Sequence, residues 1–436
     1  MQNYFFQLPL NKIDLNAILF FMKICMITNA FSLEKTTPPK KIGGAEACVE
    51  RICKSLLLKN HNILVITQRP FEGLRSLLPK KETREGLTIY SFYPLNIFSI
   101  YYTHKKTLLQ KGLWRLIDLI NPLPAIIVYG IIHKERPCLI HNHILHGFSP
   151  LFLLRLLKRT KIPLIQTLHT YGFLCLRCNL LRHNNQLCLN MPLPCRLFVF
   201  LCRALVDSLP DVVISPSVFC LGIYEKYRFF ARAKKMVLAN GIETYASNPH
   251  QEIKNSQVDF KVLSAGRLVP EKGVDVLIRA FKKLSLLKAG LTIVGEGAAE
   301  PYLKQLASGD RRIRFAGKIS WEELKELYKA ADVTVVPSVY YEILGNVILE
   351  SMSHGTPVIG SRIGGIAELI QEGCNGYLFA PGNADELKVI LQRLIDNPQQ
   401  LKIMGKNAFI FAKRYDIQNH VDALEKLYLS TQNAYA

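Results

Sequence analysis

Residues 338–370 read SVYYEILGNVILESMSHGTPVIGSRIGGIAELI, and this stretch decides how the chain is interpreted. Glu342 and Glu350 are separated by seven residues, with Gly345 and Asn346 between them. Because Glu342 follows an apolar run at Val333–Val336, we expect it in the turn that leads into a helix, with Glu350 about two turns further on. Eight residues of helix rise about 12 Å, so the two carboxylates are expected to contact opposite ends of an elongated ligand.

Between the two carboxylates, we expect a helix to start near Gly345, Asn346 and Val347. The first N–H groups of a helix have no partner inside it and attract anions, so they suit a diphosphate. Earlier in the chain, SAGRLVPEKG supplies Arg267 and Lys272 after a strand, at the edge of a parallel sheet where ligands usually bind. Arginine forks onto phosphate oxygens and lysine adds a point charge. The set predicts a nucleotide-sugar site, with one carboxylate on the sugar and the other on the ribose.

Around this site the chain shows two series of short apolar strands that alternate with helices. Continuous apolar strands in such a series indicate a parallel sheet covered on both faces. The sequence therefore predicts an α/β protein with two Rossmann-like domains, whose parallel sheets face each other across a cleft. The expected strands are Lys23–Thr28, 62–67, 138–141, 164–168 and Val212–Ser215 in the first series, and Phe260–Ala265, 291–294, 313–315, Val333–Val336 and 357–359 in the second.

A chain of 436 residues is too long for one core, which agrees with two domains. We expect a leader at 1–21, an N-terminal acceptor-side domain at 22–245 and a polar linker at 246–258. A C-terminal nucleotide-sugar-binding domain follows at 259–415, and a final helix at 416–436 is expected to cross back to the N-terminal domain. The leader lacks the basic segment and uninterrupted apolar core of a secretory signal, and the fold pattern begins at Met22.

The net charge of +21 is unevenly distributed. Residues 91–240 contain 19 Lys/Arg against 5 Asp/Glu, an excess of 14 positive charges. Cations and aromatic residues alternate there, which suits an anionic membrane surface better than a nucleic-acid groove; a solvated basic face is the alternative. The interleaved residues are Phe92, Phe98, Tyr101, Tyr102 and Trp114 with Lys105, Lys106, Lys111 and Arg115.

Eleven cysteines without an export signal indicate a reducing compartment and free thiols. Four of them, Cys175, Cys178, Cys188 and Cys195, approach the spacing of metal ligands, but the second pair is too widely spaced for an ordinary zinc ribbon. We therefore favour reduced thiols over zinc for this cluster.

The motifs resemble those of glycosyltransferase family 4, which has the GT-B fold, and they follow one another along the chain in the same order as in that family. The matching stretches are GGAEACVERICKSL, PLIQTLHTYGFLC, VISPSVF, LANGIE, LSAGRLVPEKGVDVLIRAF, IVGEGAAEPYLKQL and the stretch from Glu342 to Glu350. The resemblance implies a retaining transfer of a hexose from a nucleotide sugar. It further implies that Arg267 and Lys272 bind the diphosphate, that Glu350 binds ribose and that Glu342 contacts the transferred sugar.

In the N-terminal half, the resemblance implies two more site residues. Gly44 would let the start of a helix approach the donor phosphate closely, because glycine has no side chain in the way. His169 would face the donor sugar and, with Glu342, is assigned to the catalytic machinery. Family members commonly have aspartate after this histidine, whereas this chain has Thr170. That departure bears on the acceptor side of the reaction.

No metal and no cofactor are expected. The sequence contains no D-x-D, the metal–diphosphate ligand of the other large glycosyltransferase fold, so cations and helix N-termini would replace the ion. His141 and His143 form an H-x-H on one face of an expected strand. A metal pair there is the alternative to structural hydrogen bonding, which we favour because no third ligand is evident.

Rossmann-like sheets occur in enzymes with many different reactions, so the fold alone does not identify the function. A nicotinamide dehydrogenase is disfavoured because the glycine pattern at 295–300 lacks its third glycine. A nucleotide-sugar epimerase or hydrolase, and a non-catalytic membrane-binding protein, remain alternatives. The basic, aromatic N-terminal half favours a lipid-linked or cell-envelope glycan acceptor, an anionic membrane partner and no nucleic acid. We expect a cytoplasmic protein on the inner face of the cell membrane.

Overall fold

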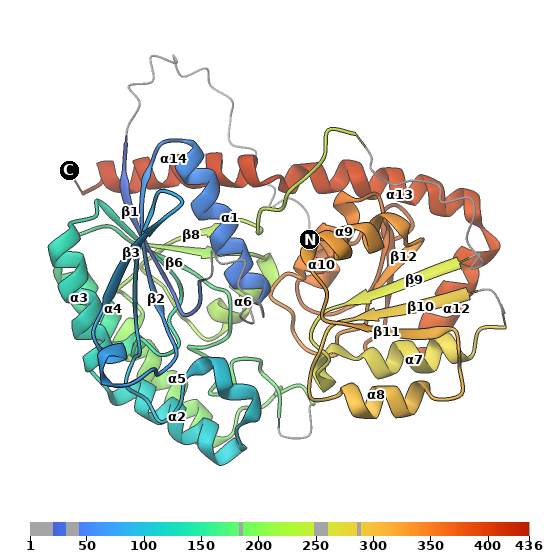
Figure 1. Cartoon of the computed structure of the whole chain (residues 1–436), viewed down its shortest axis with the longest axis horizontal. Coiled ribbons are helices and arrows are strands. Elements are labelled where there is room, and N and C mark those ends of the chain that lie inside the picture. The colour runs from blue at the N-terminus through green and yellow to red at the C-terminus, as the bar shows by residue number, and fades with distance from the viewer. Residues whose placement is uncertain (1–20, 32–42, 183–185, 248–259, 286–288, 436) are drawn as a thin grey trace.

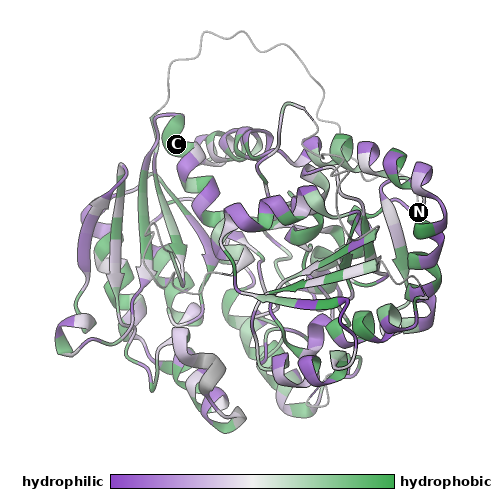
Figure 2. Ribbon diagram, turned by 45° about the vertical axis from the view of Figure 1, so that its right-hand side comes forward, coloured by the Kyte–Doolittle hydropathy of each residue, from purple (hydrophilic) through white to green (hydrophobic). Residues whose placement is uncertain are grey.

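The computed structural model describes residues 21–31, 43–182, 186–247, 260–285 and 289–435 (Figure 1). They form two α/β domains, each built on a parallel sheet, as the sequence predicts. Most of the expected leader and most of the expected linker lie outside the described residues. Hydrophobic residues predominate in the inner strands of the sheets, while the helices carry both hydrophobic and hydrophilic stretches (Figure 2).

The N-terminal sheet has eight strands in the order β3-β4-β2-β1-β5-β6-β7-β8, and all neighbours are parallel except β3 and β4. The central strands are almost wholly buried, because helices cover both faces. The strands are β1 (Lys23–Thr28), β2 (Asn62–Gln68), β3 (Lys80–Arg84), β4 (Leu87–Phe92), β5 (Leu139–Ile144), β6 (Leu164–Thr167), β7 (Val212–Ser215) and β8 (Lys234–Val237). The helices are α1 (Gly44–Leu58), α2 (Leu108–Ile120), α3 (Leu123–Glu135), α4 (Pro150–Arg159), α5 (Leu193–Val206) and α6 (Val218–Lys226), with short 3-10 helices η1 (Leu74–Leu77) and η2 (Ile100–Lys105).

The expected strands of this domain are present, but three further strands were not predicted. β3 reads KKETR and lies at one edge of the sheet, so it needs no apolar run. β8 reads KKMV and lies at the other edge. Edge strands bury little surface, so their sequences carry a weak periodic signal. The third, β4, reads LTIYSF, with polar Thr88 and Ser91 interrupting its apolar run.

The C-terminal sheet has six strands in the order β11-β10-β9-β12-β13-β14, and all are parallel. The five expected strands are present, and β14 was not predicted. The strands are β9 (Phe260–Ala265), β10 (Ala289–Val294), β11 (Ile313–Gly317), β12 (Val333–Val336), β13 (Val358–Ser361) and β14 (Gly376–Phe379). The helices are α7 (Val274–Lys282), α8 (Glu300–Ala307), α9 (Trp321–Ala330), α10 (Asn346–Ser353), α11 (Ile366–Leu369), α12 (Ala384–Asp396) and α13 (Pro398–Ala412), with 3-10 helices η3 (Pro270–Lys272) and η4 (Lys413–Tyr415).

The last helix, α14 (Ile417–Asn433), follows η4 and lies along the N-terminal domain (Figure 1). Its buried face, which includes Val421, Leu424 and Tyr428, packs into the same core as β1 and α1. Polar contacts reinforce this packing: Lys59 Nζ lies 2.6 Å from an Asp422 carboxylate oxygen. The chain therefore returns to the first domain after completing the second.

Within the described residues, no single helix is long and apolar enough to cross a membrane. One helix pair, formed by α2 and α3, meets the length and composition of a span but is bent by 45°.

Candidate active site

The carboxylate of Glu342 lies in the loop between β12 and α10 and is held by three donors. Lys272 Nζ lies 2.5 Å from Oε1, and Ser338 Oγ donates to the same oxygen at 2.8 Å. Tyr340 donates its hydroxyl to Oε2 at 2.7 Å. The side chain is buried. The carboxylate is thus fixed in one orientation before any ligand arrives.

Electrostatics keep Glu342 ionised. Burial by itself would raise the pKa of Glu342, but the Lys272 charge and the hydrogen bonds from Lys272, Tyr340 and Ser338 outweigh it, so the pKa is lowered. Lys272 also lies over the Tyr340 ring, 5.4 Å from its centroid. The site therefore presents a carboxylate charge held in an ion pair with Lys272.

Arg267 and Lys272 come from the loop after β9, as the sequence predicts. Lys272 ends η3, and Gly273 follows it with φ of +64°. A Cβ on Gly273 would lie 2.0 Å from the carbonyl oxygen of Pro337, so only glycine lets this loop pack against the loop that carries Glu342. Burial raises the pKa of Glu46 in α1, and the charge of exposed Arg267 acts against that rise, so Arg267 lies near this helix of the other domain.

Two helix N-termini meet where the domains face each other. Asn346, the first residue of α10, donates from Nδ2 to the carbonyl oxygen of Gly44 at 3.0 Å. Its Oδ1 accepts from Asn240 at 2.8 Å. Gly345 precedes the helix with φ of +97°, and Val347 follows as a half-buried residue. The N-termini of α1 and α10 therefore lie on the two sides of the contact between Asn346 and Gly44. The free N–H groups at a helix N-terminus bind anions.

Glu350 is placed by α10 but contacts the N-terminal domain. Its Oε1 lies 3.5 Å from Arg51 NH1, which comes from α1. Burial raises the pKa of Glu350, and Arg51 and Tyr328 act against that rise. Two nitrogens of Arg51, Nε and one terminal nitrogen, are buried without a hydrogen-bond partner in the described part of the chain. The carboxylate expected to bind ribose is therefore already engaged across the domain boundary.

The interval from Glu342 to Glu350 is not helical along its whole length, so the predicted separation of the two carboxylates was wrong in its basis. Helix α10 begins at Asn346, so only the second half of the interval from Glu342 to Glu350 is helical. The first half is the loop that brings Glu342 back to Lys272. The estimate of about 12 Å for eight helical residues does not apply to this interval.

His169 follows β6 and lies at the end of a chain of buried histidines. Its Nε2 is 3.0 Å from Nδ1 of His143, so one ring donates to the other. The His141 and His143 rings lie on one face of β5 with centroids 4.1 Å apart, and Nδ1 of His141 bonds the Tyr428 hydroxyl at 2.7 Å. Burial lowers the pKa of His169 to about 4, so the ring is neutral near pH 7.

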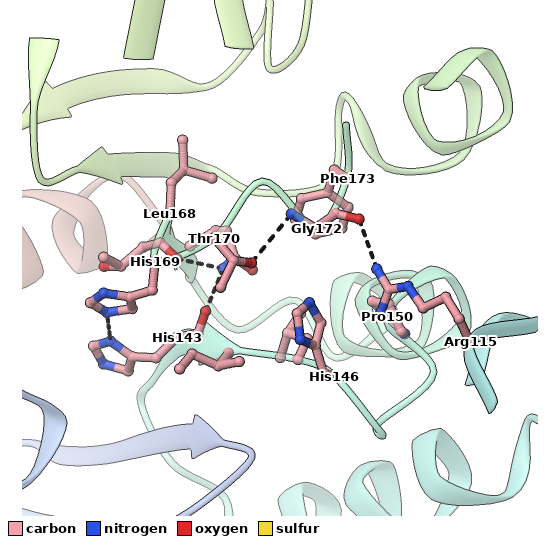
Figure 3. Close-up of a pocket in the computed structure, with 13 residues that line it drawn as sticks. Arg115, His143, His146, Pro150, Leu168, His169, Thr170, Gly172 and Phe173 are labelled. Atoms are coloured by element: carbon pink, nitrogen blue, oxygen red, sulfur yellow. Dashed lines mark hydrogen bonds between the residues drawn. The ribbon is translucent and has the colours of Figure 1, made fainter. Parts of the chain in front are cut away.

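A hollow of about 330 Å³, counting space open to solvent, adjoins His169 (Figure 3). Arg115 lines it from α2, where it pairs with Asp118 at 3.1 Å and donates to the carbonyl oxygen of Gly172 at 2.7 Å. Thr170, at the position where the family commonly has aspartate, accepts from the Gly172 N–H at 3.2 Å. His146 also lines the hollow and lies against Gly172, since a Cβ on Gly172 would come within 2.6 Å of its Nε2. The hollow therefore lies next to the His169 ring, on its N-terminal-domain side.

The two domains also contact each other outside the expected donor residues. The Glu368 carboxylate of α11 accepts the backbone N–H groups of Val218 and Phe219 at 2.9 and 2.5 Å, at the start of α6. The Phe219 ring lies 4.9 Å from that of Tyr341. These contacts hold the second domain against the first.

The structure thus brings together Glu342 with Lys272, and Gly44 with Asn346. No hydrogen bond joins His169 to Glu342 within the described residues. Sequence reasoning missed Arg51, Ser338, Tyr340 and Asn240, which hold the expected residues. Arg51 follows Gly44 by seven residues, two helical turns on the same face, and this spacing was the available signal.

In the described part of the chain, no group of three or more His, Cys, Asp or Glu residues could hold a metal ion. The cysteines are free thiols.

The buried histidines predict sensitivity to acid. The pKa of His420, a buried residue of α14, falls from the ordinary 6.5 to about 4, chiefly through burial. The unfolded chain then binds the proton more tightly, so stability present above about pH 6.5 is lost as pH falls toward 4. About 2 kcal/mol of this loss falls between pH 7 and pH 5. We expect a His420→Gln variant to lose correspondingly less stability over that interval, measured by urea unfolding at each pH.

A His133→Gln variant is the matched control, because His133 is exposed on α3. If the free energy of unfolding changes equally with pH in the wild type and in both variants, the acid sensitivity does not come from His420.

Comparisons with known proteins agree with this architecture. The model described as Glycosyltransferase Family 4 matches residues 42–245, and the model described as Glycosyl transferases group 1 matches residues 247–411. A protein named as an uncharacterized glycosyltransferase of Methanocaldococcus jannaschii is 27% identical over 397 residues, which cover 86% of this chain and 90% of that protein. The lipopolysaccharide 1,2-N-acetylglucosaminetransferase of Salmonella typhimurium is 30% identical over 253 residues, covering 53% of this chain and 66% of that protein.

Among solved structures, Anabaena HepE in complex with UDP-glucose superposes with a TM-score of 0.65 at 22% identity, covering 94% of this chain and 100% of that chain. At this identity the likeness shows the fold. Both halves of the chain therefore match in sequence and in architecture, and the protein is a glycosyltransferase of family 4 with the GT-B fold.

Proposed function

We propose that this glycosyltransferase moves a hexose from a nucleotide sugar to its acceptor with retention of the anomeric configuration. The observation that carries the proposal is the contact between Asn346 and Gly44, which sets two helix N-termini at one point beside the Glu342–Lys272 pair. A diphosphate is the ligand group that this combination of free N–H groups and cations suits best.

In the proposed complex, the donor diphosphate lies between the starts of α1 and α10. Lys272 keeps its contact with Glu342 and directs its remaining N–H donors to the phosphates, while exposed Arg267 closes over them. Negative charge grows on the diphosphate as the bond to the sugar breaks, and fixed cations stabilise it without reorganising. The same groups supply the charge neutralisation for which other enzymes use a metal ion, so we propose transfer without a metal.

The transferred sugar lies between Glu342 of one domain and His169 of the other. Ionised Glu342 stabilises positive charge on the sugar ring, and neutral His169 hydrogen-bonds to a sugar hydroxyl. The acceptor hydroxyl enters on the face from which the diphosphate leaves. Its oxygen bonds to the anomeric carbon, the bond to the diphosphate breaks, and the hydroxyl proton passes to the departing phosphate oxygen. Configuration is retained because entry and departure share one face.

Ribose binding at Glu350 requires the contact with Arg51 to rearrange. The 3.5 Å separation in that pair is long for a charge-assisted hydrogen bond. The ribose hydroxyls can therefore replace Arg51 as hydrogen-bond donors to the Glu350 carboxylate, and the Arg51 side chain can then turn toward the ligand. Donor binding and the fit between the domains are coupled through this exchange.

For the acceptor, we propose a lipid-linked or cell-envelope glycan, used on the inner, cytoplasmic face of the cell membrane. The relative from Salmonella acts on lipopolysaccharide by its name, which supports an acceptor of this class. The excess of 14 positive charges in residues 91–240 supports an anionic membrane partner. The hollow beside His169 offers the acceptor a place next to the donor sugar.

Donor identity is tested by thermal unfolding in the presence of UDP-, GDP- and ADP-sugars. A ligand that binds only the folded chain stabilises it by about 2.7 kcal/mol at roughly one hundred times its Kd. Anabaena HepE is complexed with UDP-glucose, so we expect a UDP-sugar to give the largest shift. An Arg267→Ala/Lys272→Ala variant should lose the shift. Absence of any shift in the wild type would contradict the proposed donor site.

Mechanism is tested on the glycosylated product. NMR coupling constants of the new linkage are expected to show the anomeric configuration of the donor, and added EDTA is expected to leave the rate unchanged. An inverted product would refute retention, and loss of activity in EDTA that zinc or magnesium restores would refute transfer without a metal.

A further inference from the structure

Helix α2 carries its apolar side chains on the outside. Leu109, Leu113, Leu116 and Ile120 are spaced four, three and four residues apart, so they form one stripe, and they are 83%, 49%, 54% and 62% exposed. The opposite face buries the ion pair between Arg115 and Asp118. A helix of a water-soluble domain normally shows the reverse pattern.

Helix α5 repeats this feature. Leu193, Leu197, Phe200 and Leu201 lie on one face, and all four are exposed. Both helices pack against α4, which adds the exposed Phe152, and they lie together along one edge of the N-terminal domain (Figure 1). We call these nine side chains of α2, α4 and α5 the apolar edge. Exposed apolar side chains gathered on neighbouring helices are typical of an interaction site.

The charge around the apolar edge is positive. The sequence from Arg136 to Val206, which includes α4 and α5, contains neither aspartate nor glutamate. On α2, the acidic residue is Asp118, whose carboxylate is buried against Arg115 and the N–H groups of Gly147 and Ser149. Exposed cations lie beside the apolar side chains on α4 and α5, at Arg155 and Arg196. An apolar stripe bordered by cations is complementary to an anionic bilayer surface.

The geometry favours lying on a membrane over crossing it. The α2–α3 pair is bent by 45°, and α3 buries Val128, Ile131 and Ile132 in the core of its own domain. Arg115 and Asp118 tie α2 to the loops at Gly147 and Gly172. Spanning would break these buried polar contacts, whereas surface docking leaves them intact and covers only what is already exposed.

We propose that the apolar edge docks on the surface of an anionic membrane, and that docking holds the N-terminal domain, with the hollow on the inner side of α2, close to the lipid. Arg115 belongs to α2 and lines that hollow from the face of the helix opposite the apolar stripe. The value of this placement for a lipid-linked acceptor rests on the proposed function, while the docking itself does not.

The test is co-sedimentation of the full chain with vesicles of phosphatidylcholine, with or without phosphatidylglycerol. We expect binding to the anionic vesicles that weakens with salt. A Leu109→Glu/Leu116→Glu variant should bind at least about tenfold more weakly, because each leucine loses its favourable transfer from water. Ile403→Glu/Ile410→Glu is the matched control, since these residues are seven apart on α13 and 53% and 61% exposed; it should bind like the wild type.

Three outcomes would overturn the docking proposal. The first is wild-type binding that ignores both salt and lipid charge, and the second is no binding at all. The third is self-association of the wild type in the absence of lipid that the Leu109→Glu/Leu116→Glu variant abolishes, which would make the edge a protein interface. Donor-induced thermal stabilisation of the same variant checks that it is folded. Loss of that stabilisation in Arg267→Ala/Lys272→Ala, with vesicle binding retained, separates the membrane surface from the donor site.

Discussion

Replacing Lys272 with alanine is expected to reduce kcat/KM by roughly 30- to 1000-fold, or about 2–4 kcal/mol of transition-state stabilisation, by analogy with the loss of an oxyanion donor. Two effects act together. The departing diphosphate loses a fixed cation, and Glu342 loses the partner that lies 2.5 Å from its carboxylate. Because burial then acts on Glu342 without that cation, its pKa rises. Steady-state kinetics with a saturating acceptor measure the loss.

Arg267→Ala is expected to cost a similar amount, through the diphosphate alone, because Arg267 is exposed and makes no contact with Glu342 among the described hydrogen bonds and ion pairs. Lys283→Ala serves as the control: that lysine pairs with Asp385 at the surface of the same domain, so its loss should leave kcat/KM unchanged. A Lys272→Ala variant that is folded and retains wild-type kcat/KM would remove Lys272 from the donor site.

Replacing Glu342 with glutamine is expected to lower kcat roughly a hundredfold while changing the donor KM much less. Glutamine has nearly the same shape but no charge, so the positive sugar ring of the transition state loses its nearest anion. An interaction that strengthens only in the transition state acts on kcat in this way. His169→Ala should show the same pattern from the opposite domain.

Tyr340→Phe is the companion variant for Glu342. It removes one hydrogen bond to Oε2 of Glu342 and leaves the carboxylate charge and Lys272 in place. We therefore expect a loss of about 1 kcal/mol of transition-state stabilisation. Glu342→Gln with full activity would exclude the residue from the site. A rise in donor KM with unchanged kcat would instead assign Glu342 to ground-state binding.

The candidate site was predictable where its residues are close in the chain. Glu342, Gly345, Asn346 and Glu350 fall within nine residues, and the loop of Arg267 and Lys272 directly follows a strand. Motif order alone was enough to assign them to one donor site. Their roles stay predictions, but the structure shows that Lys272 reaches Glu342, which the sequence order does not specify.

Helix α2 marks where periodicity misleads. The spacing of Leu109, Leu113 and Leu116 is that of a helix that buries its apolar face, yet this face is exposed and the charged pair is buried. Periodicity predicts an apolar stripe but not whether the stripe is buried, because that depends on the partners available to the opposite face. Here Arg115 donates to Asp118 and to a backbone carbonyl, and Asp118 accepts from two N–H groups of the loop after β5.

By itself, the sequence determined two parallel α/β domains, most of their strands and the loops that carry the charged site residues. These depend on local properties: apolar runs, glycines that permit close approach, and helix starts. Only the tertiary structure decided that Asn346 meets Gly44, that Arg51 occupies Glu350, and that His143 supports His169. The partners in these pairs are far apart in the chain, and each distance depends on how β5 and β6 align or how one domain is set against the other. No periodicity or spacing within either segment encodes that placement.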